Sequence, residues 1–202
     1  MEELIIKQEQ AKTSVWDKYV PIIQNGRNYE VYLTDGIDIP AAYNELCYVL
    51  NAAYDGDTVT LHINNGGGVS SSAFMIIAAI KNSKAYVKAK LSGMVASAAT
   101  VIVMSCDEIE VAPYTQFMIH NYFHGAQGTG NQVKEYVNFT DSEFTAAVKE
   151  IYAGFITPEE MHQVSSQDKE LWFGADETVK RWANKQLHDL GITPEEAVCK
   201  LA

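Results

Sequence analysis

The strongest constraint on the fold is an alternation of apolar and polar residues that ends in three glycines. In Thr58–Asn64 the apolar side chains fall at every second position, which is the pattern of a strand with one buried face. The glycines Gly66–Gly68 follow, and apolar residues at helical spacing then predict a helix through Ile80. A strand followed by a short connection and a helix is the repeating unit of α/β proteins.

The same unit recurs further along the chain. Ala85–Leu91 is predicted to be a strand, and a helix of small residues is predicted to begin after Ser97. Two more strands are predicted, at Glu108–Val111 and Gln116–Ile119. Strands and helices that alternate at this length predict an α/β architecture with a parallel component in its sheet.

The two ends of the chain differ from this central part. Residues 1–28 show weak periodicity and are predicted to form an N-terminal arm, which leaves 29–202 as a single domain. The C-terminal third is predicted to be helical, with a long helix over about 131–154. Thr157–Glu160 and Thr193–Glu196 each read Thr-Pro-Glu-Glu, a capping box with proline at the first helical position.

Charge and hydropathy exclude several classes of protein. The chain carries 26 acidic and 15 basic residues, a net charge of −11, and this field repels a nucleic-acid backbone. No apolar run reaches the roughly 18 residues that a membrane span needs. Because Met1–Leu4 is acidic where a secretory signal is basic, we expect a cytoplasmic protein.

The cysteines and histidines do not predict a metal site. The three cysteines, Cys47, Cys106 and Cys199, are far apart and form no CxxC pair, and no His-Glu-x-x-His motif is present. The sequence therefore predicts neither a metal nor another cofactor.

Three short segments could carry chemistry, and each has a structural alternative. Gly66–Gly68 could form a simple tight turn, or could bring backbone N–H groups close to a developing negative charge. Ser97 could cap the following helix or act as a nucleophile, although Val95 and Ala99 replace the glycines of the Gly-x-Ser-x-Gly elbow. His120, at the end of an apolar strand, could be structural or a general base.

Taken together, the order and spacing of these segments resemble the proteolytic subunit of the Clp protease. Asn64–Val69 is similar to the family's Asn-Ser-Pro-Gly-Gly-Val loop, and Gly93–Thr100 to its Gly-Gln-Ala-Ala-Ser-Met-Gly-Ala segment. Met118–Asn121 resembles its Met-Ile-His-Gln, and Gly125–Gly128 its glycine-rich stretch after the histidine. The resemblance covers about residues 29–190. It implies the spiral of strand–strand–helix repeats that Clp proteolytic subunits share with crotonases, with a helical C-terminal part.

The resemblance also implies roles for individual residues. Ser97 would be the nucleophile of a serine peptidase, and His120 the general base. The backbone N–H groups of Gly68 and Ala98 would form the oxyanion hole. The remaining residues implied to bind the substrate are Gly67, Val69, Gly125 and Gln127.

The acidic member of the triad is the least certain match. The family has an aspartate just before a Phe-Leu-Ser-Ala-like segment, and the corresponding segment here is Leu171–Glu177. Aligning on Ala175 places Glu170 at the acidic position, while Asp168 lies two residues earlier. We predict Glu170 as the third member and keep Asp168 as the alternative; both could also be solvated surface charges.

The family implies a polypeptide substrate and a homo-oligomer, a heptameric ring or double ring. Its docking groove for an ATP-driven unfoldase uses aromatic residues where this chain has Thr60, His62 and Asn82. Gly66 also replaces the family's loop proline. The groove positions, together with an N-terminal arm that lacks the family's Ser-Arg-Leu-Leu-like segment, put partnership with the standard unfoldase in doubt. The short, acidic, divergent chain resembles forms encoded by bacteriophages, which implies a role in capsid maturation.

Three alternatives remain open. Crotonase-type acyl-CoA enzymes share the fold and use backbone oxyanion holes, but need neither Ser97 nor His120. Signal-peptide peptidases of the same broad fold pair serine with lysine. The lysines available for such a pair are Lys81, Lys84, Lys88 and Lys90. The third alternative is a ring-forming protein that has lost turnover.

Overall fold

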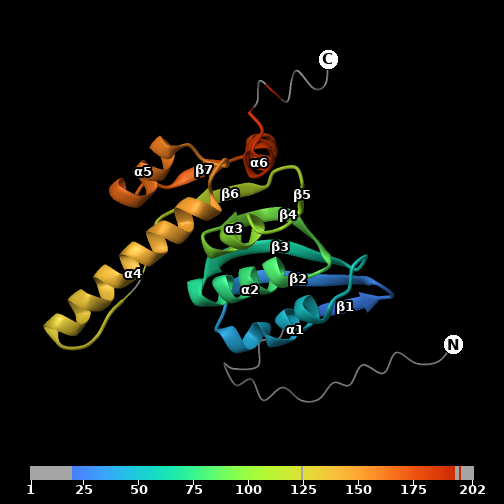
Figure 1. Cartoon of the computed structure of the whole chain (residues 1–202), viewed down its shortest axis with the longest axis horizontal. Coiled ribbons are helices and arrows are strands. Elements are labelled where there is room, and N and C mark those ends of the chain that lie inside the picture. The colour runs from blue at the N-terminus through green and yellow to red at the C-terminus, as the bar shows by residue number, and fades with distance from the viewer. Residues whose placement is uncertain (1–19, 124, 194–195, 197–202) are drawn as a thin grey trace.

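The computed structural model describes residues 20–123, 125–193 and 196, and a seven-stranded mixed sheet forms its centre (Figure 1). The strand order is β1-β2-β3-β4-β6-β7, with β5 also paired to β4. Strands β2 to β6 pair in parallel, whereas β1 and β7 join the two ends antiparallel. The strands are β1 (Ile22–Asn25), β2 (Asn28–Ile37), β3 (Thr58–Gly68), β4 (Tyr86–Ala96), β5 (Glu108–Val111), β6 (Gln116–Ile119) and β7 (Leu171–Phe173).

Helices cover one face of the sheet, and the C-terminal elements extend from its β6–β7 end (Figure 1). The helical elements are the 3₁₀ turn η1 (Pro40–Tyr43), α1 (Asn44–Ala52), α2 (Ser70–Asn82), α3 (Ala98–Val103), α4 (Gly130–Ile151), α5 (Pro158–Gln167) and α6 (Ala175–Asp189). The alternating strand predicted at Thr58–Asn64 buries Val59, Leu61 and Ile63 as expected, because alternate side chains of a strand share one face. The predicted α/β class and parallel pairing are confirmed.

The three glycines continue strand β3 instead of ending it. Gly68 pairs with Ile37 of β2, and the N–H of Val69 donates to the Ile37 carbonyl at 2.9 Å. A Cβ on Gly68 would lie 2.1 Å from that carbonyl oxygen, so only glycine permits this approach. The alternation of apolar and polar residue types stops at Asn64. The strand predicted from that alternation was therefore too short.

Part of the predicted N-terminal arm belongs to the sheet. Strand β1, at Ile22–Asn25, pairs with β2 and turns into it through Gly26, whose φ is +62°. The rest of the predicted arm, residues 1–19, lies outside the described residues.

The C-terminal part is helical, as predicted. Helix α4 runs over Gly130–Ile151 and extends away from the sheet (Figure 1), and α5 begins with the predicted capping box. The Thr157 hydroxyl accepts the Glu160 N–H at 3.1 Å, and the Glu160 carboxylate accepts the Thr157 N–H at 2.9 Å. Two donors of the first helical turn are satisfied in this way.

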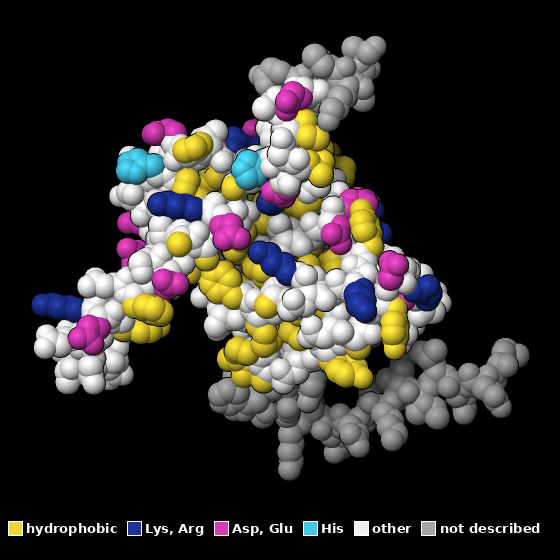
Figure 2. Space-filling view, viewed as in Figure 1, with side chains coloured by type: hydrophobic (Ala, Val, Ile, Leu, Met, Phe, Trp, Pro, Cys, Tyr) yellow, Lys and Arg dark blue, Asp and Glu magenta, His cyan; other side chains and the backbone are white. Residues whose placement is uncertain are grey.

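The structure also bears on four features that the sequence argued against: a membrane span, a metal site, a cysteine nucleophile and a basic surface. Over the described residues, no helix combines the length and apolarity needed to cross a membrane, and no cluster of metal-ligating side chains occurs. Burial raises the pKa of the Cys106 thiol, which makes a thiolate nucleophile there unfavourable. Cys199 lies outside the described residues. On the face shown in Figure 2, Lys and Arg side chains are scattered among Asp and Glu and form no basic patch.

Candidate active site

Ser97 lies in a sharp turn between strand β4 and helix α3. Its φ of 57° and ψ of −129° are unusual for a residue with a side chain, and such a conformation costs of the order of 1–3 kcal/mol. Ser97 occupies the cap position of α3, but its side chain makes no capping hydrogen bond. Instead, its Oγ lies 2.7 Å from Nε2 of His120. The structure therefore brings together the serine and histidine that the sequence singled out.

Strand pairing explains why these two residues meet. Strands β4 and β6 are parallel, with Ala96 opposite Met118. Both strands therefore end on the same side of the sheet, at its carboxyl end. The N–H of Ser97 donates to the Met118 carbonyl at 2.9 Å. Ser97 is thereby attached to the strand that ends just before His120.

The glycine loop lies directly against the Ser97 turn. A Cβ on Gly67 would lie 2.4 Å from the Ser97 Cβ and 3.0 Å from the Ala98 nitrogen, and the φ of Gly67 is +93°. The Gly67 N–H donates to Oδ1 of the buried Asn65 at 2.8 Å, and this hydrogen bond holds the loop in place. Glycine at this position is required both by space and by backbone conformation.

A cavity of about 450 Å³ opens beside Ser97. Gly68 and Ala98, whose N–H groups are predicted to form the oxyanion hole, both line it, together with His120. Much of the remaining wall is apolar or aromatic and comes from three helices. These residues include Phe74 of α2, Val101 of α3, and Phe144 and Val148 of α4. The cavity can accept an apolar group next to the serine hydroxyl.

The four other predicted substrate-binding residues do not line this cavity. Gly67 is buried behind Ser97, whereas Val69, Gly125 and Gln127 are exposed at the surface. Their assignment stays a prediction.

Glu170 directly precedes strand β7 and His120 directly follows its partner strand β6, but the Glu170 carboxylate is bonded to another residue. In the antiparallel pair of β6 and β7, Ile119 faces Leu171, so the next residues of the two chains are His120 and Glu170. The Glu170 carboxylate is exposed and accepts a hydrogen bond from Nε1 of Trp172 at 3.0 Å.

Asp168 is also engaged by a residue other than His120. Its Oδ1 accepts the side-chain amide of Asn121 at 2.9 Å, and it ends helix α5 with a φ of 51°. Within the described part of the chain, no hydrogen bond joins His120 to Glu170 or to Asp168. The third member of the triad therefore stays a prediction.

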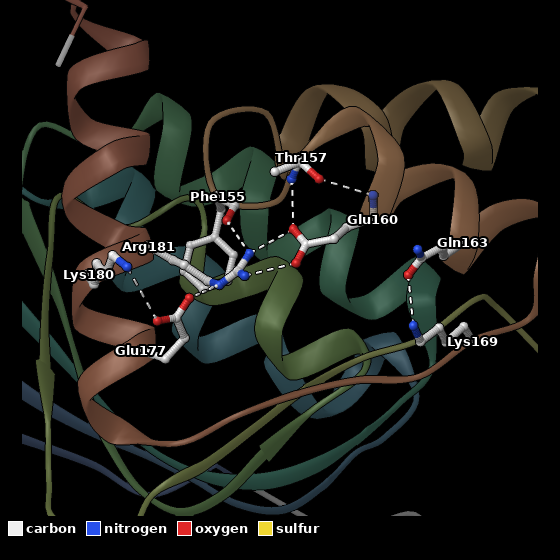
Figure 3. Close-up of polar contacts among 8 residues, drawn as sticks. All are labelled: Phe155, Thr157, Glu160, Gln163, Lys169, Glu177, Lys180 and Arg181. Carbon is white, nitrogen blue, oxygen red and sulfur yellow. Dashed lines mark hydrogen bonds and ion pairs between the residues drawn. The ribbon is translucent and has the colours of Figure 1, made fainter. Parts of the chain in front are cut away.

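An ion-pair network joins helices α5 and α6 beside strand β7 (Figure 3). The Arg181 guanidinium donates to both carboxylate oxygens of Glu160 at 2.8 Å, to Glu177 at 2.7 Å and to the Phe155 carbonyl at 3.2 Å. It also lies over the Phe173 ring, 4.2 Å from the centroid. Arg181 lowers the pKa of Glu160 below its usual 4.5, chiefly through the hydrogen bonds to its side chain.

Sequence reasoning missed the polar residues that support the site. Asn65 directly precedes the three glycines, and a short amide before a glycine loop could have signalled a backbone contact. The pairing of Trp172 with Glu170 follows their two-residue spacing along one face of a strand. Nothing in the local sequence marked Asn121 as a partner of Asp168.

One comparison with known proteins agrees with the fold. The family model described as Clp protease matches residues 23–181, which is well over half of the chain. No curated protein matches it significantly.

Proposed function

Because the chain belongs to the Clp protease family, we propose that it hydrolyses peptide bonds, with Ser97 as nucleophile and His120 as general base. The observation that carries this proposal is the 2.7 Å contact between Ser97 Oγ and His120 Nε2. Nucleophilic catalysis needs such a contact, because a serine hydroxyl attacks efficiently only when a base takes its proton. A crotonase-type acyl-CoA enzyme would have no use for this pair.

The proposed reaction has two halves. Ser97 Oγ attacks the substrate carbonyl while its proton moves to His120 Nε2, and the imidazolium then protonates the leaving amine. A water molecule, deprotonated by the same imidazole, then attacks the acyl-serine ester; as the ester C–O bond breaks, the imidazolium returns the proton to Ser97 Oγ and the second product is released. Both halves use the same nitrogen and leave the enzyme unchanged.

Backbone N–H groups would stabilise the oxyanion that forms in each half. Gly68 and Ala98 line the same cavity as Ser97, which supports them as donors. The first N–H groups of a helix also favour negative charge, and Ala98 begins α3. Removing one such donor typically costs about 100- to 1,000-fold in turnover.

The shape of the cavity supports a preference for apolar side chains beside the cleaved bond. Phe74 and Phe144 contact each other in its wall, with ring centroids 5.8 Å apart. A charged side chain placed against these rings would lose its hydration without a partner.

The position of Glu170 favours one second candidate, a Clp-family protein that assembles but does not turn over. Its carboxylate is bonded to Trp172, so it does not orient the His120 ring. In triads of this kind the acidic group holds the imidazole in its productive tautomer, and losing it lowers turnover by orders of magnitude. Activity thus depends on whether Glu170 turns towards His120 when substrate is bound.

The proposal extends to assembly and partners. We propose a homo-oligomer, a heptameric ring or double ring, as family membership suggests, acting on polypeptides in the cytoplasm. Thr60 is buried, His62 stacks on Tyr32 at 4.5 Å, and Asn82 is exposed, so the predicted unfoldase groove offers no exposed aromatic residue at these positions. This supports action without the standard unfoldase, as in a phage-encoded form that processes capsid proteins. Degradation of folded substrates with a Clp unfoldase would count against that role.

The first experiment is intact-mass detection of a fluorophosphonate adduct on the purified protein. We expect one adduct on the wild type and none on Ser97→Ala, because only an activated serine reacts rapidly with this probe. An unlabelled wild type that is folded and assembled would instead support the protein without turnover.

A further inference from the structure

Two buried hydroxyl groups connect the end of helix α4 to the backbone of Ser97. The Tyr152 hydroxyl lies 2.6 Å from Oγ1 of Thr100, and that Oγ1 lies 2.6 Å from the Ser97 carbonyl oxygen. Thr100 is fully buried and Tyr152 is 2% exposed, so water does not compete for these bonds. The Thr100 N–H donates to the same carbonyl at 2.9 Å.

The direction of both hydrogen bonds follows from the number of protons available. A carbonyl oxygen only accepts, so Thr100 donates its single hydroxyl proton to Ser97. Tyr152 must then donate to Thr100. Burial raises the pKa of Tyr152, which keeps the phenol protonated and able to donate at any working pH.

The Ser97 carbonyl matters because it shares a planar peptide group with the Ala98 N–H. Fixing the direction of the C=O bond fixes the direction of the N–H bond, which points the opposite way. The Ala98 N–H is one of the two proposed oxyanion donors. The same bonds hold the unfavourable φ of Ser97, whose own N–H is attached to Met118.

We propose that Tyr152 is a positioning residue: through Thr100, it holds the Ser97–Ala98 peptide in the orientation that stabilises the oxyanion. This inference rests on the proposed peptidase function. Tyr152 also lines the cavity beside Ser97, but its hydroxyl is bonded to Thr100 and does not need to touch the substrate. Because the oxyanion forms only during the reaction, losing this support lowers turnover more than substrate binding.

The test compares Tyr152→Phe and Thr100→Val with a matched control, Thr178→Val, by steady-state kinetics on a fluorogenic peptide. Thr178 is also fully buried and its hydroxyl also donates to a backbone carbonyl, that of Gly174 at 2.9 Å, but it lies in α6. We expect about 10- to 100-fold lower kcat for Tyr152→Phe and Thr100→Val, with KM within about twofold. Thr178→Val should keep the wild-type kcat.

Two further variants separate positioning from general stability. Thr100→Ser keeps the hydroxyl and should retain kcat within about threefold. The double variant Tyr152→Phe/Thr100→Val should be no slower than Thr100→Val alone, because both changes break one chain of bonds. Full additivity, or an equal loss of kcat in Thr178→Val, would overturn the inference.

Crystal structures of the variants make the inference testable apart from activity. We expect the Ser97–Ala98 peptide to rotate in Tyr152→Phe and to keep its orientation in Thr178→Val. An active wild type with an unchanged peptide and unchanged kcat in Tyr152→Phe overturns the positioning role and leaves the peptidase proposal intact. An inactive wild type overturns the peptidase proposal; the peptide orientation in Tyr152→Phe then decides the positioning role.

Discussion

The nucleophile side of the candidate site and its carboxylate side are built in different ways. Ser97 is held by buried backbone contacts from β6 and α3 and by close packing against Gly67. Glu170 and Asp168 are exposed, and each is bonded to a neighbour other than His120. The position of the nucleophile is thus set by the fold, whereas that of the carboxylate is set by side-chain rotation.

The two sides therefore differ in what it costs to change them. Moving the Ser97 turn would break several buried hydrogen bonds at once, each expensive to leave unmade. Releasing the Glu170 carboxylate from Trp172 breaks one exposed hydrogen bond, worth about 1 kcal/mol. A bound substrate or a second subunit could supply that much free energy. The comparison teaches that the carboxylate side of the site is held much more weakly than the nucleophile side.

We expect the largest effect from Gly67→Ala, which perturbs the nucleophile side of the site. The added Cβ would overlap Ser97 and the backbone oxygen of Ala96, at a φ of +93° that disfavours any side chain. Strain and overpacking together predict a loss of about 2–6 kcal/mol in the free energy of unfolding, with adduct formation at Ser97 abolished. Denaturant unfolding and intact-mass labelling measure the two effects.

Gly66→Ala is the matched control for stability, because it changes the adjacent residue of the same loop. A Cβ there meets no atom within 4 Å, and the φ of Gly66 is not in the left-handed region. Its free energy of unfolding should stay within about 0.5 kcal/mol of the wild type. Similar losses in both variants would show that the close approach of Gly67 to Ser97 is not what makes this side rigid.

We expect a smaller effect from Glu170→Gln, which tests the carboxylate side of the site. If Glu170 turns to His120 in the working enzyme, removing its charge should lower kcat by about 10- to 1,000-fold without changing the free energy of unfolding by more than about 0.5 kcal/mol. Peptide-hydrolysis kinetics measure the first quantity, and denaturant unfolding the second.

Asp168→Asn and Trp172→Phe complete this test. Asp168→Asn should change kcat less than threefold, since Asp168 is bonded to Asn121. Trp172→Phe removes the N–H that holds the carboxylate of Glu170, and should leave kcat equal to or above that of the wild type. A larger loss in Asp168→Asn than in Glu170→Gln would transfer the acidic role to Asp168.

Sequence reasoning was most successful where the backbone itself restricts the residue type. The glycine loop, the small residues around Ser97 and the alternation in β3 each reflect a local requirement for space or for one buried face. These patterns predicted the α/β class and the parallel pairing, which the structure shows, and the family resemblance implied the pairing of Ser97 with His120, whose side chains lie 2.7 Å apart. The resemblance to the Clp protease is confirmed by the family match.

Sequence reasoning failed where the outcome depends on how distant elements pack. Tyr152 lies 52 positions from Thr100, and only the packing of the end of α4 on α3 brings their hydroxyls together. The rotamer of Glu170 depends on the competing indole of Trp172, which an alignment on Ala175 does not weigh. The contact between Tyr152 and Thr100 leaves no periodic trace in the sequence.

The smallest expected effect concerns the ion pair between Arg181 and Glu160, which is tested through the pH dependence of the unfolding temperature. Because Arg181 lowers the pKa of Glu160 in the folded protein, the Glu160 carboxylate stabilises the fold at pH values above its usual pKa of 4.5. This stabilisation is lost as the pH falls through the lowered value in the folded protein. Glu160→Gln should therefore unfold at a lower temperature than the wild type at pH 7, and the difference should shrink below about pH 4.5.

Thermal unfolding between pH 3 and pH 7 measures this difference, with Glu159→Gln as the control. Glu159 is the neighbouring residue in the first turn of α5, is exposed and makes no ion pair among the described residues. Its substitution should shift the unfolding temperature by less than that of Glu160 and without the same loss below pH 4.5. If both variants behave alike, the helix end rather than Arg181 stabilises this region. The orientation of β7, and with it the reach of Glu170 towards His120, would then not depend on the ion pair.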